Sequence, residues 1–322
     1  MLDNKTILIT GGTGSFGQNA TEFLLSNSKV KKIIIFSRDE NKQFIMQNKL
    51  KDKRLRFFLG DVRDQSRIEL ALNGVDLLIH AAALKHVPAA EYNPFEFIKT
   101  NVHGAENVIS ASLSKKVKKV LMLSTDKACN PINLYGATKL CSEKLFVNAN
   151  YYSGTKGTLF GVVRYGNVIS SRGSVIPLFK NLIKDGQKEL PLTHKDMTRF
   201  FITLPEAIKF VFNSLNLLKG GEIFIPKMKS IHISDIIKLI DSKIKIKISG
   251  IRPGEKIHET LCSHDESNYV YENKNYYAIY PPIFFLSKFK TGKKVKQGFV
   301  YSSNIKSNFF KTSEFKEILK KY

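Results

Sequence analysis

Residues 124–139, STDKACNPINLYGATK, hold two pairs of ionisable side chains that could carry chemistry. Tyr135 and Lys139 are four positions apart, so on a helix they share one face. A neighbouring ammonium favours phenolate, and Lys139 is therefore expected to lower the pKa of Tyr135. Such a tyrosine can take a proton from a substrate hydroxyl. Asp126 and Lys127 stand side by side just upstream, and this proton transfer does not need them.

The Asp126–Lys127 pair follows an apolar run, VLMLS (120–124), and Thr125. This run is typical of a buried strand, and ligands of parallel sheets bind at the carboxyl ends of strands. Thr125, Asp126, Lys127 and Tyr135 are therefore candidate catalytic residues. The spacing alone equally allows a surface ion pair, or a cap of the next turn.

A glycine-rich loop, TGGTGSFG (10–17), separates the first apolar run from a helix-like segment. Glycines at such a junction permit a tight turn, close approach of the backbone to a pyrophosphate and close helix packing. The N–H groups at the start of the helix then face the anion. The pattern predicts a dinucleotide site formed by Gly11, Thr13, Gly14, Ser15, Phe16 and Gly17.

The end of the second apolar run bears on the choice of cofactor. NAD enzymes place an acid there for the ribose hydroxyl, but this chain has Ser37 followed by Arg38. A hydroxyl and a guanidinium suit a 2′-phosphate, which favours NADP over NAD. Asp39 argues for NAD, while Lys42 either joins the phosphate site or is a solvated lysine.

Further cofactor contacts are expected after the third and fourth runs. Asp61 and Val62 follow the third run, where a carboxylate can accept a hydrogen bond from an adenine amino group. Asp61 could instead cap the next helix. Ala81 closes the fourth run and is expected near the adenosine ribose. Lys85 could reach the cofactor or the substrate, or be a solvated loop lysine.

Short apolar runs alternate with helix-like segments through the N-terminal half. The runs are TILIT (6–10), KIIIFS (32–37), RFFLG (56–60), DLLIH (76–80), VLMLS (120–124) and LFGVVRY (159–165), with helices expected at 18–26, 65–72 and 94–113. This alternation predicts an α/β fold with a doubly wound parallel Rossmann sheet.

The regularity fades after about residue 168. We expect a helix at 203–218 and a strand at 222–226 that return to the sheet, and a further helix within 231–243. The predicted division is therefore a cofactor-binding Rossmann domain, 1–168 plus about 203–226. A smaller C-terminal substrate-binding lobe would comprise 169–202 and 227–322.

Composition limits the classes of function. The 322 residues carry 51 Lys and Arg against 28 Asp and Glu, a formal net charge of +23. The lysines are scattered without an arginine block, so we expect an anionic small molecule and no nucleic acid. Three cysteines without metal-ligand spacing predict reduced thiols and no metal site. With no signal peptide and no long apolar run, a cytoplasmic location without membrane insertion is expected.

The glycine loop, the strand-end Ser-Thr and the YxxxK spacing make the chain resemble the extended short-chain dehydrogenase/reductase family. It is more narrowly similar to the inverting UDP-N-acetylglucosamine 4,6-dehydratases that begin pseudaminic acid biosynthesis. The matching stretches run from residue 7 to residue 259: ILITGGTGSFG, FSRDENKQ, FFLGDVRD, HAAALKHVPAAEYNP, STDKACNPINLYGATKL, RYGNV, SRGSVIP, MTRFFIT, GGEIFIPK and GIRPGEKIHE.

The resemblance implies a use for the Asp126–Lys127 pair. A dehydratase must remove the C5 proton of the sugar and protonate the leaving C6 hydroxyl, in addition to oxidising C4. Lys127 would be the base, neutral because burial and nearby cations lower its pKa. A protonated Asp126 would be the acid, and Tyr135 would act with tightly bound NADP, which Lys139 would help to hold. Return of a proton to the opposite face would invert C5.

The resemblance also implies UDP-N-acetylglucosamine as substrate and a homo-oligomer, with a hexamer as one form. Its substrate contacts would be Lys85, Asn167, Arg199, Arg252 and Glu255, the arginines being suited to phosphate. The chain departs from the family pattern at Ser170, where a glycine is usual, and at Phe201, where a tryptophan is usual. These changes bear on sugar preference.

Two alternatives stay open. A retaining dehydratase or a C4/C5 epimerase would share the fold, and product stereochemistry and loss of water would separate them. A catalytically idle NADP-binding regulatory protein is the alternative without enzymatic activity. It is disfavoured by the intact set of Thr125, Asp126, Lys127, Tyr135 and Lys139.

Overall fold

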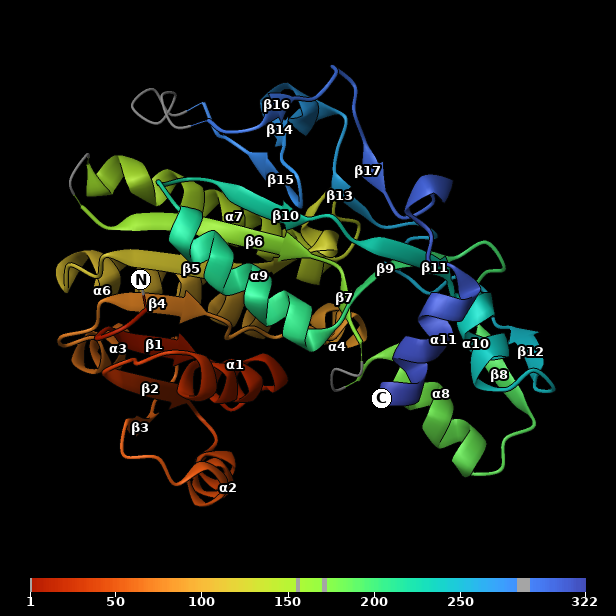
Figure 1. Ribbon diagram of the computed structural model, residues 1–322, viewed down its shortest axis with the longest axis horizontal. Coiled ribbons are helices and arrows are strands. Elements are labelled where there is room, and N and C mark those ends of the chain that lie inside the picture. Colours follow the sequence, from red (N-terminus) through yellow and green to blue (C-terminus); the bar gives the residue numbers. More distant parts are fainter. Residues whose placement is uncertain (1, 155–156, 170–172, 283–289) are drawn as a thin grey trace.

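A ten-stranded sheet forms the centre of the larger lobe in the computed structural model, which describes residues 2–154, 157–169, 173–282 and 290–322 (Figure 1). Its strand order is β16-β14-β15-β10-β6-β5-β4-β1-β2-β3. The strands from β3 to β10 in this order are parallel: β1 (Thr6–Thr10), β2 (Lys32–Ser37), β3 (Leu55–Leu59), β4 (Leu77–His80), β5 (Lys119–Thr125), β6 (Leu159–Tyr165) and β10 (Ile223–Pro226). The predicted strands are confirmed, with ends that match or differ by one residue.

Helices cover both faces of this sheet because its strands are apolar on both sides. In β1, Ile7 and Ile9 pack on one face and Leu8 on the other. The first face carries α1 (Ser15–Asn27), α2 (Glu40–Leu50) and α9 (Leu204–Leu217), and the second carries α3 (Gln65–Ala71), α6 (Gly104–Ser114) and α7 (Leu134–Ser153). The predicted doubly wound α/β fold is confirmed.

The helical segment predicted at 94–113 is divided in the structure. It contains α5 (Pro94–Phe97), a π-helical stretch (Ile98–His103) and α6. A shorter helix, α4 (Val87–Tyr92), precedes them.

Three antiparallel strands extend the large sheet beyond β10. They are β15 (Tyr276–Ile279), β14 (Val270–Glu272) and β16 (Lys293–Lys294). The predicted division places these residues in the second lobe, whereas their backbone hydrogen bonds place them in the Rossmann sheet. Strands of two to four residues carry too little periodicity for the sequence to assign them.

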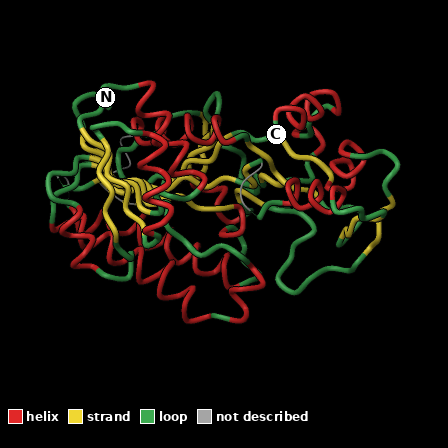
Figure 2. The backbone as a smooth tube through the Cα atoms, turned by 90° about the horizontal axis from the view of Figure 1, so that it is seen from below, coloured by secondary structure: helices red, strands yellow, loops and turns green. Residues whose placement is uncertain are grey.

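The second lobe has its own small sheets and apolar core. Figure 1 shows it beyond the arrowheads of the parallel strands, and Figure 2 shows the molecule from below. Its strands form the groups β11-β9-β7 and β12-β8. Its elements are β7 (Asn167–Val168), α8 (Val175–Lys184), β8 (Glu189–Leu192), β9 (Thr198–Ile202), β11 (Lys229–His232), α10 (Ile233–Ile240), β12 (Lys245–Ile248) and α11 (Thr312–Lys321). A last antiparallel pair joins β13 (Thr260–Cys262) to β17 (Tyr301–Ser302).

The Phe201 departure lies in the core of this second lobe. Its ring is buried and packs at 5.7 Å, centroid to centroid, on Phe315 of α11. The other departure, Ser170, lies outside the described residues. The change at Phe201 therefore acts on packing of the lobe.

Candidate active site

A cleft of about 670 Å³ opens at the carboxyl ends of β1, β2 and β3. Most of the predicted cofactor residues line it: Gly11, Thr13, Gly14, Ser37, Arg38, Asp39, Lys42, Asp61, Val62 and Ala81. Phe36, Gly60, Ala82, Ala83 and Thr100 complete the wall and were not predicted.

The glycine loop is packed too closely for side chains. Gly11 has φ +63°, and a Cβ there would lie 2.9 Å from the backbone of Ala82. A Cβ on Gly17 would lie 2.4 Å from the carbonyl oxygen of Gly12. Ser15, Phe16 and Gly17 lie in the first turn of α1. This turn contains no acidic side chain, and no side chain caps it. Its N–H groups are thus available to an anion.

The carboxylate of Asp39 is engaged by its own helix. It accepts a hydrogen bond from the backbone N–H of Lys42 (2.9 Å) and pairs with the Lys42 ammonium. Ser37 is buried and accepts a hydrogen bond from Gln43 Nε2 (3.0 Å). Arg38 stays half exposed on the cleft, with Nη1 3.5 Å from Asp61 Oδ2. Two cations therefore flank this end of the cleft.

Asp61 does not cap the following helix. That position belongs to Asp64, which accepts from the backbone N–H of Arg67 (3.0 Å). The Asp61 carboxylate instead pairs with Arg63 Nη2 at 2.7 Å. Burial acts to raise the pKa of Asp61, but hydrogen bonds from Arg63 outweigh it and the pKa is lowered. Asp61 is thus an anion at the cleft.

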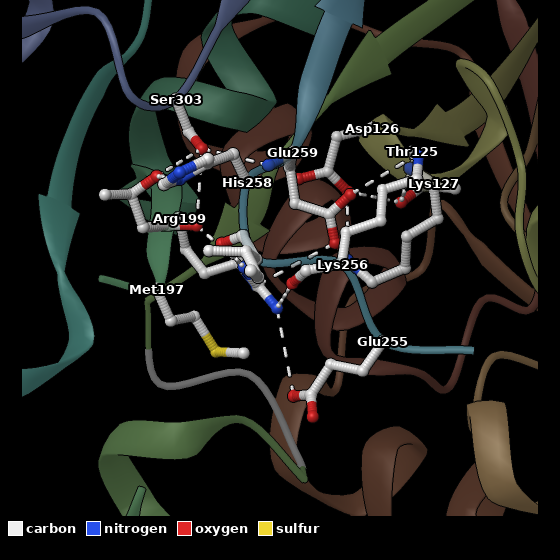
Figure 3. Close-up of polar contacts among 12 residues, drawn as sticks. Thr125, Asp126, Lys127, Met197, Arg199, Glu255, Lys256, His258, Glu259 and Ser303 are labelled. Atoms are coloured by element: carbon white, nitrogen blue, oxygen red, sulfur yellow. Dashed lines mark hydrogen bonds and ion pairs between the residues drawn. The ribbon is translucent and has the colours of Figure 1, made fainter. Parts of the chain in front are cut away.

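The Asp126–Lys127 pair lies in the interior at the end of β5 (Figure 3). A single 3-10 turn, Asp126–Ala128, follows Thr125, whose hydroxyl accepts from the backbone N–H of Lys127 (3.3 Å). Asp126 is fully buried, and Lys127 Nζ lies 3.0 Å from its Oδ1. The alternative of a surface ion pair is therefore wrong.

The turn packs directly against the start of α7, which brings Tyr135 to the pair. Asn133 caps this helix by accepting from the backbone N–H of Gly136 (2.7 Å). A Cβ on Gly136 would lie 2.2 Å from the carbonyl oxygen of Lys127, so only glycine allows this approach.

Glu259 joins the pair from the second half of the chain and was not predicted as a site residue. Its Oε1 lies 3.2 Å from Lys127 Nζ, and its side chain is buried (Figure 3). Glu259 is the last residue of GIRPGEKIHE, one of the stretches that resemble the dehydratases. That resemblance is the sequence signal that could have identified it. Nothing local to residue 259 indicates a contact with residue 127.

The protonation expected for Lys127 is wrong in this structure. Burial acts to lower the pKa of Lys127, but the carboxylates of Asp126 and Glu259 outweigh burial and raise it. Burial also raises the pKa of Asp126, against the charge of Lys127. Lys127 is therefore favoured as an ammonium between the two carboxyl groups, while burial shifts Asp126 towards its protonated form.

Tyr135 also differs from the expectation. Burial raises its pKa to about 12, and the cation that opposes this is Lys127, helped by a hydrogen bond with Thr125. Lys139 instead donates from Nζ to the carbonyl oxygen of Leu123 (2.7 Å). Burial lowers the pKa of Lys139 to about 8. The expected lowering of the Tyr135 pKa by Lys139 is therefore wrong.

Of the predicted substrate residues, Arg199 reaches this cluster, with Nε 3.8 Å from Glu259 Oε1, and Glu255 contacts Arg199. Arg199 is buried, and its guanidinium donates to the carbonyl oxygens of Thr198 (2.7 Å), Lys256 (2.7 Å) and Ile257 (2.9 Å). Glu255 Oε1 lies 3.8 Å from Arg199 Nη2, and its Oε2 lies 3.9 Å from Nε of the exposed Arg252. Glu255 thus links the two arginines.

Asn167 and Lys85 are the remaining residues predicted to contact the substrate. Asn167 begins β7 and pairs in register with Phe201 of β9. Desolvation and the charge of Lys127 lower the pKa of Lys85, which places Lys85 within electrostatic reach of Lys127.

The sequence pattern of the family described as polysaccharide biosynthesis protein matches residues 7–281, which include the cleft, the cluster and Glu259. The chain belongs to this family.

Relatives of this chain include proteins named as a dehydratase and as an epimerase. The chain is 54% identical over 328 aligned residues to UDP-N-acetylglucosamine 4,6-dehydratase (inverting) of Campylobacter jejuni subsp. jejuni, covering 99% of this chain and 98% of that one. It is 44% identical to UDP-glucose 4-epimerase of Rickettsia canadensis over 87% of this chain and 84% of the relative. The crystal structure of Pen from Bacillus thuringiensis superposes with a TM-score of 0.91 at 38% identity, covering 100% and 98% of the two chains.

Proposed function

We propose that this chain is an inverting UDP-N-acetylglucosamine 4,6-dehydratase, a hydro-lyase. Its product would be UDP-2-acetamido-2,6-dideoxy-β-L-arabino-hex-4-ulose. The observation that carries the proposal is the pairing of the buried Asp126 with the largely buried Lys127 at the end of β5, beside Tyr135 of α7. Oxidation at C4 needs only the tyrosine, whereas removal of water needs an acid and a base in addition. The 54% identity to an enzyme of this name supports the same assignment.

The resident cofactor of the proposal is NADP. The glycine loop, which a Cβ would obstruct, suits a pyrophosphate, and Arg38 and Lys42 suit a 2′-phosphate. Asp39, the residue that argued for NAD, is held by the N-terminus of α2. When bound, NADP would supply the redox chemistry, as hydride acceptor for C4 and hydride donor for C6. Metal is not part of the proposal.

The chain's own residues would move the protons. Tyr135 takes the proton of the C4 hydroxyl, with Thr125 and the Lys127 charge favouring its phenolate. The C4 ketone acidifies the C5 proton, which Lys127 removes. Asp126, protonated in its buried site, gives its proton to the C6 hydroxyl as water leaves. A proton returned to the other face of C5 inverts that centre.

The second lobe would hold the UDP-sugar. Arg252 is exposed, oriented by Glu255 and suited to a diphosphate. Arg199 shares Glu255 and borders the catalytic cluster, so it would fix the segment that carries Glu259 as well as contact phosphate. Asn167 and Lys85 would contact the sugar.

A 4-epimerase is the second candidate, because the chain is 44% identical to a protein of that name. An epimerase would return hydride to C4 and release no water. It would leave the Asp126–Lys127 pair without a chemical step, and the dehydratase is therefore the better proposal.

NMR of the purified protein incubated with UDP-N-acetylglucosamine in D₂O tests the proposal. We expect a 4-keto-6-deoxy sugar with deuterium at C5 and the L-arabino configuration. Retention of the D configuration would indicate a retaining dehydratase, and a product that keeps its C6 hydroxyl would indicate an epimerase. Cofactor binding without turnover would support the regulatory alternative.

In the cell, this activity would be the first step of pseudaminic acid biosynthesis in the cytoplasm. The sugar would then serve flagellin or a surface polysaccharide, and the enzyme would act as a homo-oligomer, with a hexamer as one form. Within the described ranges, no helix combines the length and apolar character that a membrane crossing needs.

A further inference from the structure

Glu259 is held rigidly between the two lobes. Its backbone N–H donates to Ser303 Oγ (2.9 Å), and its carbonyl oxygen accepts from the backbone N–H of Ser303 (2.8 Å). Ser303 Oγ is in turn 2.7 Å from Thr198 Oγ1 (Figure 3). The buried carboxylate is therefore fixed in place from the side opposite Lys127.

The carboxylate of Glu259 is surrounded by cations but only partly used. Oε1 lies 3.2 Å from Lys127 Nζ and 3.8 Å from Arg199 Nε, and Oε2 lies 4.0 Å from Lys256 Nζ. Among the described residues, Oε2 has no hydrogen-bond partner, and neither does Asp126 Oδ2. Lys127 thus bridges two buried carboxyl groups, each with an oxygen free to carry a proton.

A lysine in this position cannot act as a base until it loses a proton. An ammonium has no lone pair, and bulk water is excluded from the buried carboxyl groups around it. The acceptor in reach is Glu259 Oε1, because Asp126 must keep its own proton for the leaving hydroxyl. Building on the dehydratase proposed above, we infer that Glu259 takes the surplus proton of Lys127 and frees it to act at C5.

The proton count balances through the elimination. The site starts with protonated Asp126, Lys127 ammonium and Glu259 carboxylate. Transfer from Nζ to Oε1 gives a neutral amine and a neutral acid, and the amine then takes the C5 proton. The electrons of the C5–H bond form the C5–C6 double bond as the C6–O bond breaks, and Asp126 protonates the departing hydroxyl to water.

The relay resets through the same lysine. After water leaves, Asp126 is a carboxylate, Lys127 an ammonium and Glu259 an acid, which is the same total number of protons. Lys127 Nζ lies 3.0 Å from Asp126 Oδ1 and 3.2 Å from Glu259 Oε1. It can therefore give a proton to Asp126 and take one from Glu259, which restores the starting state.

Other charges face this site and enter its pH dependence. They are Arg199 of β9, Lys256 of the segment before β13, Tyr135 of α7 and Lys85 of the loop after β4. Arg199 and Lys256 favour the Glu259 carboxylate and so keep the relay in its starting state between turnovers.

Glu259→Gln tests the relay. The variant is isosteric but cannot accept the proton, so Lys127 must lose it to solvent. We expect the rate of water loss at neutral pH to fall by at least about hundredfold. That rate should rise by about tenfold per pH unit under alkaline conditions, whereas the wild-type rate stays flat there. Formation of reduced cofactor on addition of UDP-N-acetylglucosamine, followed by its absorbance, should persist.

Two further variants separate the relay from a structural role. Glu259→Asp keeps an acceptor and should restore most of the activity and the flat pH profile. Glu222→Gln changes an equally buried glutamate that binds only backbone N–H groups away from the site, and it should leave both unchanged.

The outcomes divide clearly. Undiminished water loss by Glu259→Gln, with a normal wild type, would overturn the relay and leave the dehydratase standing. A loss that is the same at every pH and is not relieved in Glu259→Asp would also overturn it, since that is structural damage. A wild type that releases no water from UDP-N-acetylglucosamine would overturn the proposed function and the relay with it.

Discussion

Three ionisable side chains meet beside the end of β5, and their charges determine each other. Asp126 and Glu259 lie on either side of Lys127 Nζ, at 3.0 and 3.2 Å. Removing one member of such a group leaves the others buried without compensation. The protonation of Lys127 is therefore a property of the cluster.

Replacing Lys127 with alanine tests its role directly. Water loss should fall by at least about hundredfold, because the base at C5 is gone. Binding of NADP should be unchanged, because Lys127 does not line the cofactor cleft. Product NMR and cofactor titration measure the two effects. Lys118→Ala, an exposed lysine paired with Asp76, is the control, and full dehydratase activity in Lys127→Ala would contradict the assigned role.

The choice of NADP can be tested at Arg38. Arg38→Ala removes a guanidinium from the edge of the cleft, and affinity for NADP should fall by about ten- to hundredfold. Affinity for NAD should change little, because NAD lacks the 2′-phosphate. Titration calorimetry with both cofactors measures the ratio, with Lys49→Ala on the outer part of α2 as control. Equal weakening for both cofactors would speak against a 2′-phosphate contact.

For single residues, the sequence predicted which of them line the cofactor cleft better than it predicted the pKa values of Lys127 and Tyr135. The residues of the cleft were identifiable because each follows a strand end, where the fold places ligands. The pKa values of Lys127 and Tyr135 were predicted in the wrong direction because the outcome depends on Glu259 and on burial. Glu259 reaches Lys127 only when the second half of the chain folds onto β5, and Tyr135 is buried only when its helix packs on Ala90 and Phe97.

At the scale of elements, the start of α1 is the most constrained junction. Gly17 packs its Cα against the loop at Gly12. Gly17→Ala would place a Cβ 2.4 Å from the Gly12 carbonyl oxygen, so the helix and the phosphate loop must separate. We expect affinity for NADP to fall by at least about tenfold, measured by calorimetry.

Asn19→Ala is the matched control for this junction. It lies on the same helix, is exposed, and bonds only to the Ser15 carbonyl oxygen. Its cofactor affinity should equal that of the wild type. An unchanged affinity in Gly17→Ala would mean that the loop tolerates the displacement.

Strands were predicted correctly where a continuous apolar run in the sequence marks them. The parallel strands of the N-terminal half are continuous apolar runs, and the ends of each were predicted to within one residue. The strands β14, β15 and β16 were not, since they are short and gain their stability from pairing with β10. Edge strands of this kind are determined by tertiary contacts and not by their own sequence.

For the whole molecule, an ionic network centred on the buried Arg164 joins the segment after β13 to α7, the helix that carries Tyr135. Arg164 of β6 is fully buried and pairs with Glu143 of α7 (2.6 Å) and with Glu266 (2.9 Å), which follows β13. Glu143 also accepts from Ser124 Oγ (2.5 Å), the neighbour of Thr125. The network therefore connects the segment that carries Glu259 to α7 and β5.

Arg164→Met removes the centre of this network and leaves the buried carboxylate of Glu143 and the partly buried carboxylate of Glu266 without their cation. The free energy of unfolding, measured by urea titration, should fall by about 3–5 kcal/mol. Arg54→Met, which breaks a partly exposed pair with Asp52, should cost only about 0–1 kcal/mol. The large loss is expected because the two carboxylates must be protonated or hydrated once the cation is gone. Equal losses in the two variants would mean that water reaches Glu143 and Glu266, and that the network does not hold the two halves of the chain together.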